Sequence, residues 1–139
     1  MPTDADCLFC KIVAGDLPGT IIDSDERTVS FMDTFPVARG HALVVPRLHA
    51  RDLHDIGRED LAAVMLTAQR LAGRARDALK ADGVNILNFC GRAAWQTVFH
   101  FHLHMIPRYD DDSLRLQWVP GPGDPGEIAA AAKLLKVDD

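Results

Sequence analysis

The chain has 139 residues, of which 47% are hydrophobic and 25% charged, and its formal net charge is −5 at pH 7. This length allows one domain with a buried core, the composition is typical of a soluble globular protein, and the negative charge disfavours a nucleic-acid partner. No apolar run reaches the ~18 residues that a membrane span requires, and the N-terminus lacks the basic start of a secretory signal, so we expect no membrane association.

The first half of the chain reads as short segments separated by turn residues. Apolar and β-branched runs indicate strands, and prolines and glycines mark where the segments end. The expected segments are a short helix over 7–14, strands that start at 21 and cover 28–32 and 41–46, and a turn over 33–36.

The second half begins with the one long helix that the pattern predicts, from about 58 to 81, where apolar residues recur every three or four positions. The segments after it are a strand over 84–89, a loop over 91–94, a histidine-bearing strand over 96–106, a linker over 121–126 and a helix over 127–136. This order predicts an α+β fold, an antiparallel sheet with one main helix plus short N- and C-terminal helices. We expect a single domain over 1–139, with its core at about 7–109 and a C-terminal tail over 119–139.

Three histidines, His100, His102 and His104, alternate with apolar residues in the last predicted strand. Successive side chains of a strand point to opposite faces, so the three imidazoles would share one face with neighbours roughly 7 Å apart. Imidazole is poor core material but serves as a nucleophile, proton carrier or metal ligand near neutral pH. Because three alternate strand positions span about 13 Å, one ion with ~2 Å bonds cannot bind all three imidazoles.

Cys7 and Cys10 form a C-x2-C pair, which is one half of a familiar four-ligand zinc site. There is no second pair of this kind, so the remaining ligands would be histidines, and the candidates outside the row are His41, His49 and His54. A redox pair and two idle buried thiols are competing interpretations. Three cysteines are an odd number, which favours a reducing compartment over a disulfide framework, and we expect a cytoplasmic protein.

The segment GRAAWQT at 91–97 is a candidate anion-binding loop. Its small residues let backbone N–H groups reach an anion, and Gln96 and Thr97 add side-chain donors. An ordinary loop is the competing interpretation. From the local sequence alone, we expect His41 to make a structural hydrogen bond and Asp33 to belong to a turn.

Four segments in this order resemble the histidine-triad (HIT) nucleotide hydrolases and transferases, most closely their Hint-type branch and its zinc-bearing bacterial members. The resemblance covers nearly the whole chain, and it implies a HIT-like fold assembled as a homodimer. The segments are CLFCKI at 7–12, FMD at 31–33, HALVVPRLH at 41–49 and HFHLHMIPR at 100–108, with Gln96-Thr97-Val98 ahead of the last.

The resemblance implies a phosphoramidase or hydrolase that acts on purine nucleoside 5′-monophosphate conjugates through a covalent nucleotidyl-histidine. His102 matches the nucleophile, and His104, Gln96 and Thr97 match residues that contact the phosphate. Asp33 would hydrogen-bond the ribose hydroxyls. The other residues that match nucleotide-binding positions are Phe9, Ile12, Phe31 and Leu43, and Asn88 lies near the family's phosphate-side asparagine.

The resemblance also implies a structural zinc ion held by Cys7, Cys10, His49 and His100, with no metal required for the chemistry. His100 would then serve the metal and His102 the reaction. Alternative functions are a dinucleoside polyphosphate hydrolase, zinc-dependent hydrolysis at the triad, and a nucleotide-binding or interaction module with weak turnover.

The chain departs from the family pattern beside the phosphate loop. Many members have glycine where this chain has Trp95, and asparagine where it has Phe89 and Cys90. A tryptophan at this position would narrow the entrance to the phosphate site. The preference for a leaving group is therefore the property that these departures are expected to affect.

Overall fold

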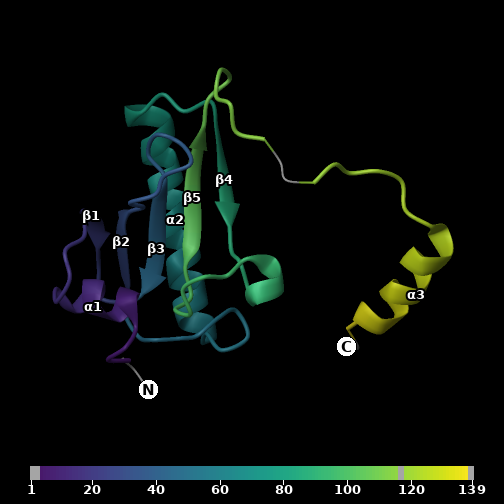
Figure 1. The fold of residues 1–139 in the computed structure, drawn as a ribbon, viewed down its shortest axis with the longest axis horizontal. Helices are drawn as coiled ribbons and strands as arrows, with labels where there is room; N and C mark the ends of the chain where they lie inside the picture. The colour runs from purple at the N-terminus through teal and green to yellow at the C-terminus, as the bar shows by residue number, and fades with distance from the viewer. Residues whose placement is uncertain (1–3, 116–117, 138–139) are drawn as a thin grey trace.

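The computed structural model describes residues 4–115 and 118–137. Its centre is a five-stranded antiparallel sheet with the strand order β1-β2-β3-β5-β4 (Figure 1). The elements are α1 (Leu8–Ala14), β1 (Ile21–Ser24), β2 (Thr28–Met32), β3 (Ala42–Pro46), α2 (Arg58–Ala78), β4 (Gly83–Leu87), a single 3-10 turn (Arg92–Ala94), β5 (Leu103–Arg108) and α3 (Pro125–Leu135). This architecture confirms the predicted fold class.

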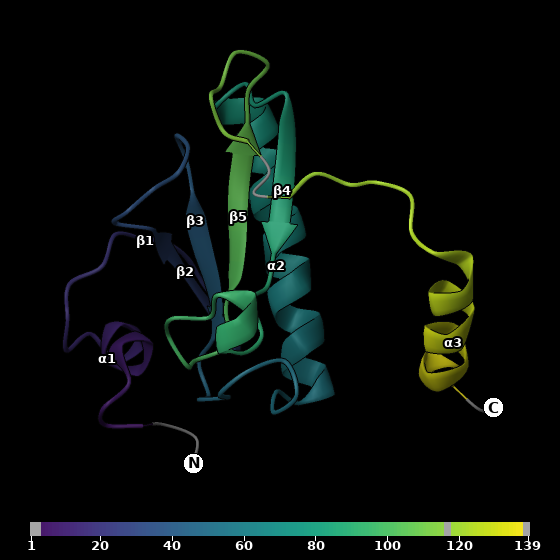
Figure 2. The same cartoon turned by 45° about the vertical axis from the view of Figure 1, so that its right-hand side comes forward.

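The central strand β3 buries side chains on both faces of the sheet. Ala42 and Val44 belong to the apolar cluster beneath α2, whereas Leu43 and Val45 belong to a second cluster that includes Phe9 of α1. This separation follows from the period of two along a strand. The two helices accordingly lie on opposite sides of the sheet (Figure 2).

The predicted long helix is confirmed as α2, and its buried side chains lie three or four positions apart. It begins at Arg58, as predicted, and ends at Ala78, a little before the predicted end. Lys80 takes a positive φ of 58°, which stops the helix and turns the chain toward β4. The buried residues of α2 are Val64, Thr67, Ala68, Leu71 and Ala75.

Helix α1 carries the C-x2-C pair at its start. Cys7 is the N-cap, and its Sγ accepts a hydrogen bond from the backbone N–H of Cys10. Gly15 ends the helix with a φ of 84°, a left-handed conformation that glycine adopts without steric penalty. The helix cap therefore holds the two cysteines close together.

The prediction of one histidine-bearing strand over 96–106 is wrong in its first half. Strand β5 begins at Leu103, so of the three histidines only His104 lies in the sheet. The backbone of the preceding segment bonds elsewhere, since the N–H of Phe101 donates to the carbonyl of Ala50 at 2.7 Å. Phe101 still packs in the apolar cluster beneath α2. The histidines on either side of it therefore point away from α2, although the segment before Leu103 is not a strand.

The C-terminal helix α3 stands apart from the sheet in both views (Figures 1 and 2). Asp124 caps it by accepting the backbone N–H of Glu127, and Pro125 occupies the first turn. All side chains of α3 are exposed. Within the described ranges, none of the helices combines the length and the apolar character that crossing a membrane would need.

Candidate functional site

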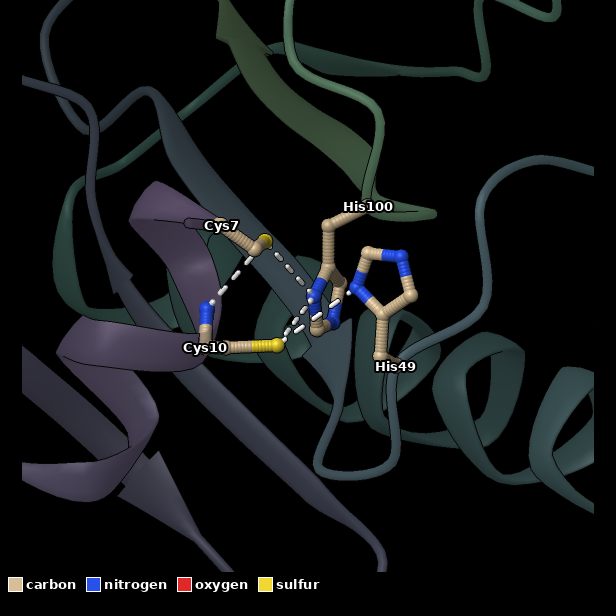
Figure 3. A group of neighbouring side chains, drawn as sticks. All are labelled: Cys7, Cys10, His49 and His100. Carbon is tan, nitrogen blue, oxygen red and sulfur yellow. Dashed lines mark hydrogen bonds between the residues drawn. The ribbon is translucent and has the colours of Figure 1, made fainter. Parts of the chain in front are cut away.

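Two cysteines and two histidines from three parts of the chain meet beside the start of α1 (Figure 3). The Sγ atoms of Cys7 and Cys10 each lie 3.4 Å from Nδ1 of His100, and Cys10 Sγ lies 3.5 Å from Nδ1 of His49. Tetrahedral zinc with its usual bond lengths keeps ligand atoms about 3.3–3.8 Å apart. The three S–N distances match this spacing, and all four donor atoms lie within 4.8 Å of one another, so the cluster has the composition and size of a tetrahedral site.

The groups around this cluster orient its imidazoles. His100 Nε2–H donates to the carbonyl of Pro46 at 2.8 Å, so Nδ1 of that ring presents its lone pair to the cysteines. His49 Nε2 lies 4.0 Å from the carboxylate of Asp4. Such contacts to the second ring nitrogen are usual for metal-ligating histidines. Burial lowers the pKa of His100 to about 4, which favours the neutral ring that metal binding requires.

His102 is buried, and its hydrogen bond determines which nitrogen carries the proton. Nδ1 lies 2.7 Å from the carbonyl oxygen of His100. A carbonyl can only accept, so Nδ1 carries the proton and Nε2 keeps its lone pair. Asn88 Nδ2 donates to the carbonyl of His102 at 3.0 Å and fixes the backbone. Burial also lowers the pKa of His102, so the ring is neutral and nucleophilic near pH 7.

Most of the predicted nucleotide-contacting residues line one cavity of about 360 Å³ beside the triad. This volume lies within the usual range for small-molecule sites. A larger cavity of about 960 Å³ lies between α2 and the β1–β2 hairpin, and its described lining includes none of the predicted site residues. The predicted residues that line the smaller cavity are Phe9, Ile12, Phe31, Asp33, Leu43, Thr97, His102 and His104.

His104 is linked to His41, which the sequence offered as a structural hydrogen-bonding residue and as one of three candidate metal ligands. The N–H of Val37 donates to His41 Nδ1 at 3.2 Å, so the His41 proton is on Nε2. That Nε2 lies 2.9 Å from His104 Nδ1 and 3.4 Å from a carboxylate oxygen of Asp33. His104 Nδ1 therefore accepts a hydrogen bond, and its Nε2 keeps a proton that it can donate.

The trio Asp33, His41 and His104 also has the composition of a metal site, because one donor atom of each lies within 4.8 Å of the others. The bond from Val37 argues against that use. If His41 bound a metal through Nε2, its neutral ring would carry the proton on Nδ1. The N–H of Val37 already points at Nδ1, so two N–H groups would then face each other. The arrangement instead favours a hydrogen-bonded relay that orients His104.

The burial of His104 makes the stability of the fold depend on pH. Burial, with nearby His102 and His41, lowers the pKa of His104 from 6.5 to about 4. The imidazole of His104 therefore binds a proton more readily in the unfolded chain than in the folded protein. The stability that the neutral ring contributes is complete above about pH 6.5, and it is lost as pH falls from 6.5 toward 4.

We therefore expect the free energy of unfolding to be about 1–2 kcal/mol lower at pH 5 than at pH 7.5 through this group alone. Denaturant titrations at both pH values measure the difference for the wild type and for His104→Asn. The pH effect should shrink in that variant and persist in His54→Asn, because His54 is exposed. An undiminished pH effect in His104→Asn would contradict the prediction.

Gln96 and Asn88 do not line the nucleotide cavity. The amide of Gln96 holds the loop: Nε2 donates to the carbonyls of Arg51 and Val98 at 2.9 and 3.0 Å, and Oε1 accepts the N–H of Gly91 at 2.8 Å. Both of its N–H donors are thus engaged. A direct contact of either residue with a phosphate stays a prediction.

Comparison with known proteins identifies relatives over most of the chain. The adenosine 5′-monophosphoramidase of Saccharomyces cerevisiae is 41% identical over 110 residues, which are 79% of this chain and 67% of that protein. A crystal structure of a zinc-bound histidine triad family protein from Mycobacterium smegmatis is 43% identical, with a TM-score of 0.77 over 93% of this chain and 95% of that one. A Streptococcus mutans protein of 35% identity superposes with a TM-score of 0.90, covering 96% of this chain and 85% of that chain.

The family profile described as the HIT domain matches residues 14–111, which include β1 through β5 and all three triad histidines. The fold, the order of the segments and the relatives agree with this match. The chain therefore belongs to the HIT domain family.

Proposed function

We propose that the protein is a hydrolase that releases a purine nucleoside 5′-monophosphate from phosphoramidate conjugates through His102. The observation that carries the proposal is the hydrogen bond from His102 Nδ1 to the His100 carbonyl, which leaves Nε2 as a nucleophile in a ring that lines the cavity. The yeast relative's name, adenosine 5′-monophosphoramidase, supports the substrate class.

The reaction would proceed in two displacements. In the first, the Nε2 lone pair of His102 forms a bond to the α-phosphorus, and the P–N bond breaks with its electron pair leaving on the nitrogen, which takes a proton from water. In the second, water attacks the phosphorus, loses a proton to solvent, and the bond pair returns to His102 Nε2. The products are the nucleoside monophosphate and a free amine.

Two hydrogen bonds support these steps. The carbonyl of His100 accepts from His102 Nδ1 and would stabilise the positive ring of the covalent intermediate. The Nε2–H of His104, whose direction the bond from His41 determines, would donate to the phosphoryl oxygen as charge develops there. Thr97, which lines the same cavity, adds a hydroxyl donor.

The nucleoside would occupy the rest of the cavity. The apolar side chains of Phe9, Phe31 and Leu43 suit the flat face of a purine, and Ile12 lies beside them. The carboxylate of Asp33 is partly exposed in the same cavity and would accept hydrogen bonds from the ribose hydroxyls. We infer that the base is a purine, without distinguishing adenine from guanine.

We also propose that Cys7, Cys10, His49 and His100 hold a structural zinc ion. Bound there, zinc would join the N-terminal helix to the segment that carries His102. None of the steps above uses the ion. The zinc-bound relative from Mycobacterium smegmatis supports the choice of metal.

A homodimer and a cytoplasmic location complete the proposal. Exposed apolar residues at the end of α3, such as Leu134 and Leu135, are available to a second copy. None of the three cysteines, all of which the structure describes, forms a disulfide, and this suits a reducing compartment. Light scattering of the purified chain distinguishes a dimer from a monomer.

Incubation with adenosine 5′-phosphoramidate tests the function directly. We expect AMP to accumulate, and intact-mass analysis of rapidly quenched protein should show one attached adenylyl group in the wild type and none in His102→Ala. Diadenosine triphosphate serves as the comparison substrate for the dinucleoside polyphosphate alternative. Tight AMP binding without AMP release from any conjugate would replace the proposal with a nucleotide-binding module.

A further inference from the structure

The cavity of about 960 Å³ between α2 and the β1–β2 hairpin has no part in the function proposed above. It lies on the face of the sheet that α2 covers, whereas the nucleotide cavity lies on the opposite face, beside α1. Met32 is the one residue that the described linings of the two cavities share. The volume is at the upper end of the usual range for small-molecule sites. The protein therefore has room for a second small molecule.

The floor of this cavity is apolar and aliphatic. Leu71, Ala75 and Met105 belong to the buried cluster beneath α2, and Met32 and Leu79 pack against the same cluster. None of the described lining residues is aromatic, so the cavity offers no ring for stacking. Methionine side chains are flexible and fit irregular apolar shapes. The floor thus favours a hydrocarbon chain over a flat ring.

Three arginines stand around this apolar floor, although the whole chain carries a net charge of −5. Arg70 and Arg74 lie one turn apart on α2, and Arg39 comes from the loop before β3. All three residues are exposed. Asp23 is the one acidic residue in the described lining. The cavity is therefore a positively charged place on an acidic protein.

Two of these three guanidinium groups have no partner. Arg70 Nη2 lies 2.6 Å from the carboxylate of Asp23. Over residues 4–115 and 118–137, the side chains of Arg39 and Arg74 make neither an ion pair nor a hydrogen bond. A guanidinium presents its N–H donors in a planar fork that matches a carboxylate. Two such groups beside an aliphatic floor are the complement of an anion with a hydrocarbon tail.

Gly40 brings the loop that carries Arg39 into contact with the end of α2. Its φ is 89°, and a Cβ atom at this position would lie 2.5 Å from Cδ1 of Leu79. A residue with a side chain would therefore push the loop away from the helix. The contact between loop and helix closes this end of the cavity.

We propose that this cavity binds a medium-chain carboxylate, with its hydrocarbon tail on the apolar floor and its head group at Arg39 and Arg74. The tail fits because the lining supplies methyl and methylene groups. A single negative charge fits because two guanidinium groups are unpaired, whereas the carboxylate of Asp23 would repel a more highly charged head group. The site is independent of the proposed hydrolase activity and is tested by binding alone.

Octanoate titrated into the full chain, with isotope-labelled methionine methyl groups observed by NMR, gives a local test. Met105 lines this cavity and not the nucleotide cavity, and Met65 of α2 lines neither. We expect a saturable shift of the Met105 resonance and an unchanged Met65 resonance, both with and without AMP. An unmoved Met105 resonance, or displacement of octanoate by AMP, would overturn the inference.

Acetate and octanol separate the two parts of the ligand. Acetate keeps the charge without the tail, and octanol keeps the tail without the charge. Each should bind at least about tenfold more weakly than octanoate, because burial of the tail and pairing of the head group both contribute. Equal affinity of either compound would contradict the inference.

Arg39→Gln and Arg74→Gln should each weaken octanoate binding about tenfold. Ala78→Phe should weaken it as well, because Ala78 lines the cavity and the larger side chain would occupy the place of the tail. Arg76→Gln is the matched control, since Arg76 is an exposed arginine of the same helix that pairs with Asp77 and does not line this cavity. It changes the net charge by the same amount as Arg74→Gln and should bind octanoate like the wild type. An equal loss in the two variants would refute a site at Arg74.

Vesicles distinguish a soluble ligand from a membrane surface, which arginines around an apolar opening would also contact. Cosedimentation with vesicles of phosphatidylglycerol and phosphatidylcholine in equal parts should show no binding that depends on Arg39 or Arg74. Vesicle binding that Arg74→Gln abolishes, with no shift of Met105 by octanoate, would replace the small-molecule site by a membrane contact.

Discussion

Replacement of His102 by alanine is expected to lower kcat/KM for AMP release by at least about 10³-fold, because the covalent route loses its nucleophile. The buried ring is oriented by its Nδ1–H bond to the His100 carbonyl, and none of the other imidazoles among the described residues has this arrangement. His104 has its Nδ1 occupied by His41 and retains a proton on Nε2, so it cannot replace the lost lone pair without changing partners.

Turnover of adenosine 5′-phosphoramidate, measured by chromatography, and intact-mass analysis together check this expectation. The variant should bind AMP, keep its melting temperature within a few degrees of the wild type and show no adenylylated protein. His54→Ala is the control, because His54 is exposed and does not line the nucleotide cavity. Full activity of His102→Ala would refute the covalent mechanism.

Loss of the zinc ligands is expected to reduce stability before it affects chemistry. Cys10→Ser should abolish zinc binding and lower Tm by about 10 °C or more, since a bound structural zinc contributes directly to folding free energy. The cluster connects α1 to the segment that carries His102 and to the chain after β3. Its removal would loosen the nucleotide cavity, to which Phe9 of α1 contributes.

Metal analysis should find one zinc ion per chain in the wild type and in Cys90→Ser, and none in Cys10→Ser. Cys90 is the matched control, since it is a free cysteine outside the cluster. With a chelator, AMP release should decline in parallel with unfolding. Immediate loss of activity while the fold stays intact would instead indicate zinc-dependent hydrolysis.

Local residue patterns predicted most of the fold. The apolar and β-branched runs of β2 and β3 and the spacing of apolar residues in α2 depend on neighbours in the chain, so the sequence predicts these elements to within a few residues. The predicted histidine strand is too long because its true start depends on contacts with residues far away in the chain. Alternation alone cannot tell whether a segment finds strand partners, and the backbone of Phe101 bonds to Ala50 instead.

The candidate site residues can also be divided into features that local sequence predicts and features that depend on long-range contacts. By itself the sequence determined that the three histidines share one side of the chain and that a C-x2-C pair needs other ligands. The family resemblance predicted that His100 joins the cysteines, and only the tertiary structure showed that the donor atoms meet and that His41 orients His104. These relations depend on strand register and loop closure between residues far apart in the chain, which short-range periodicity does not encode.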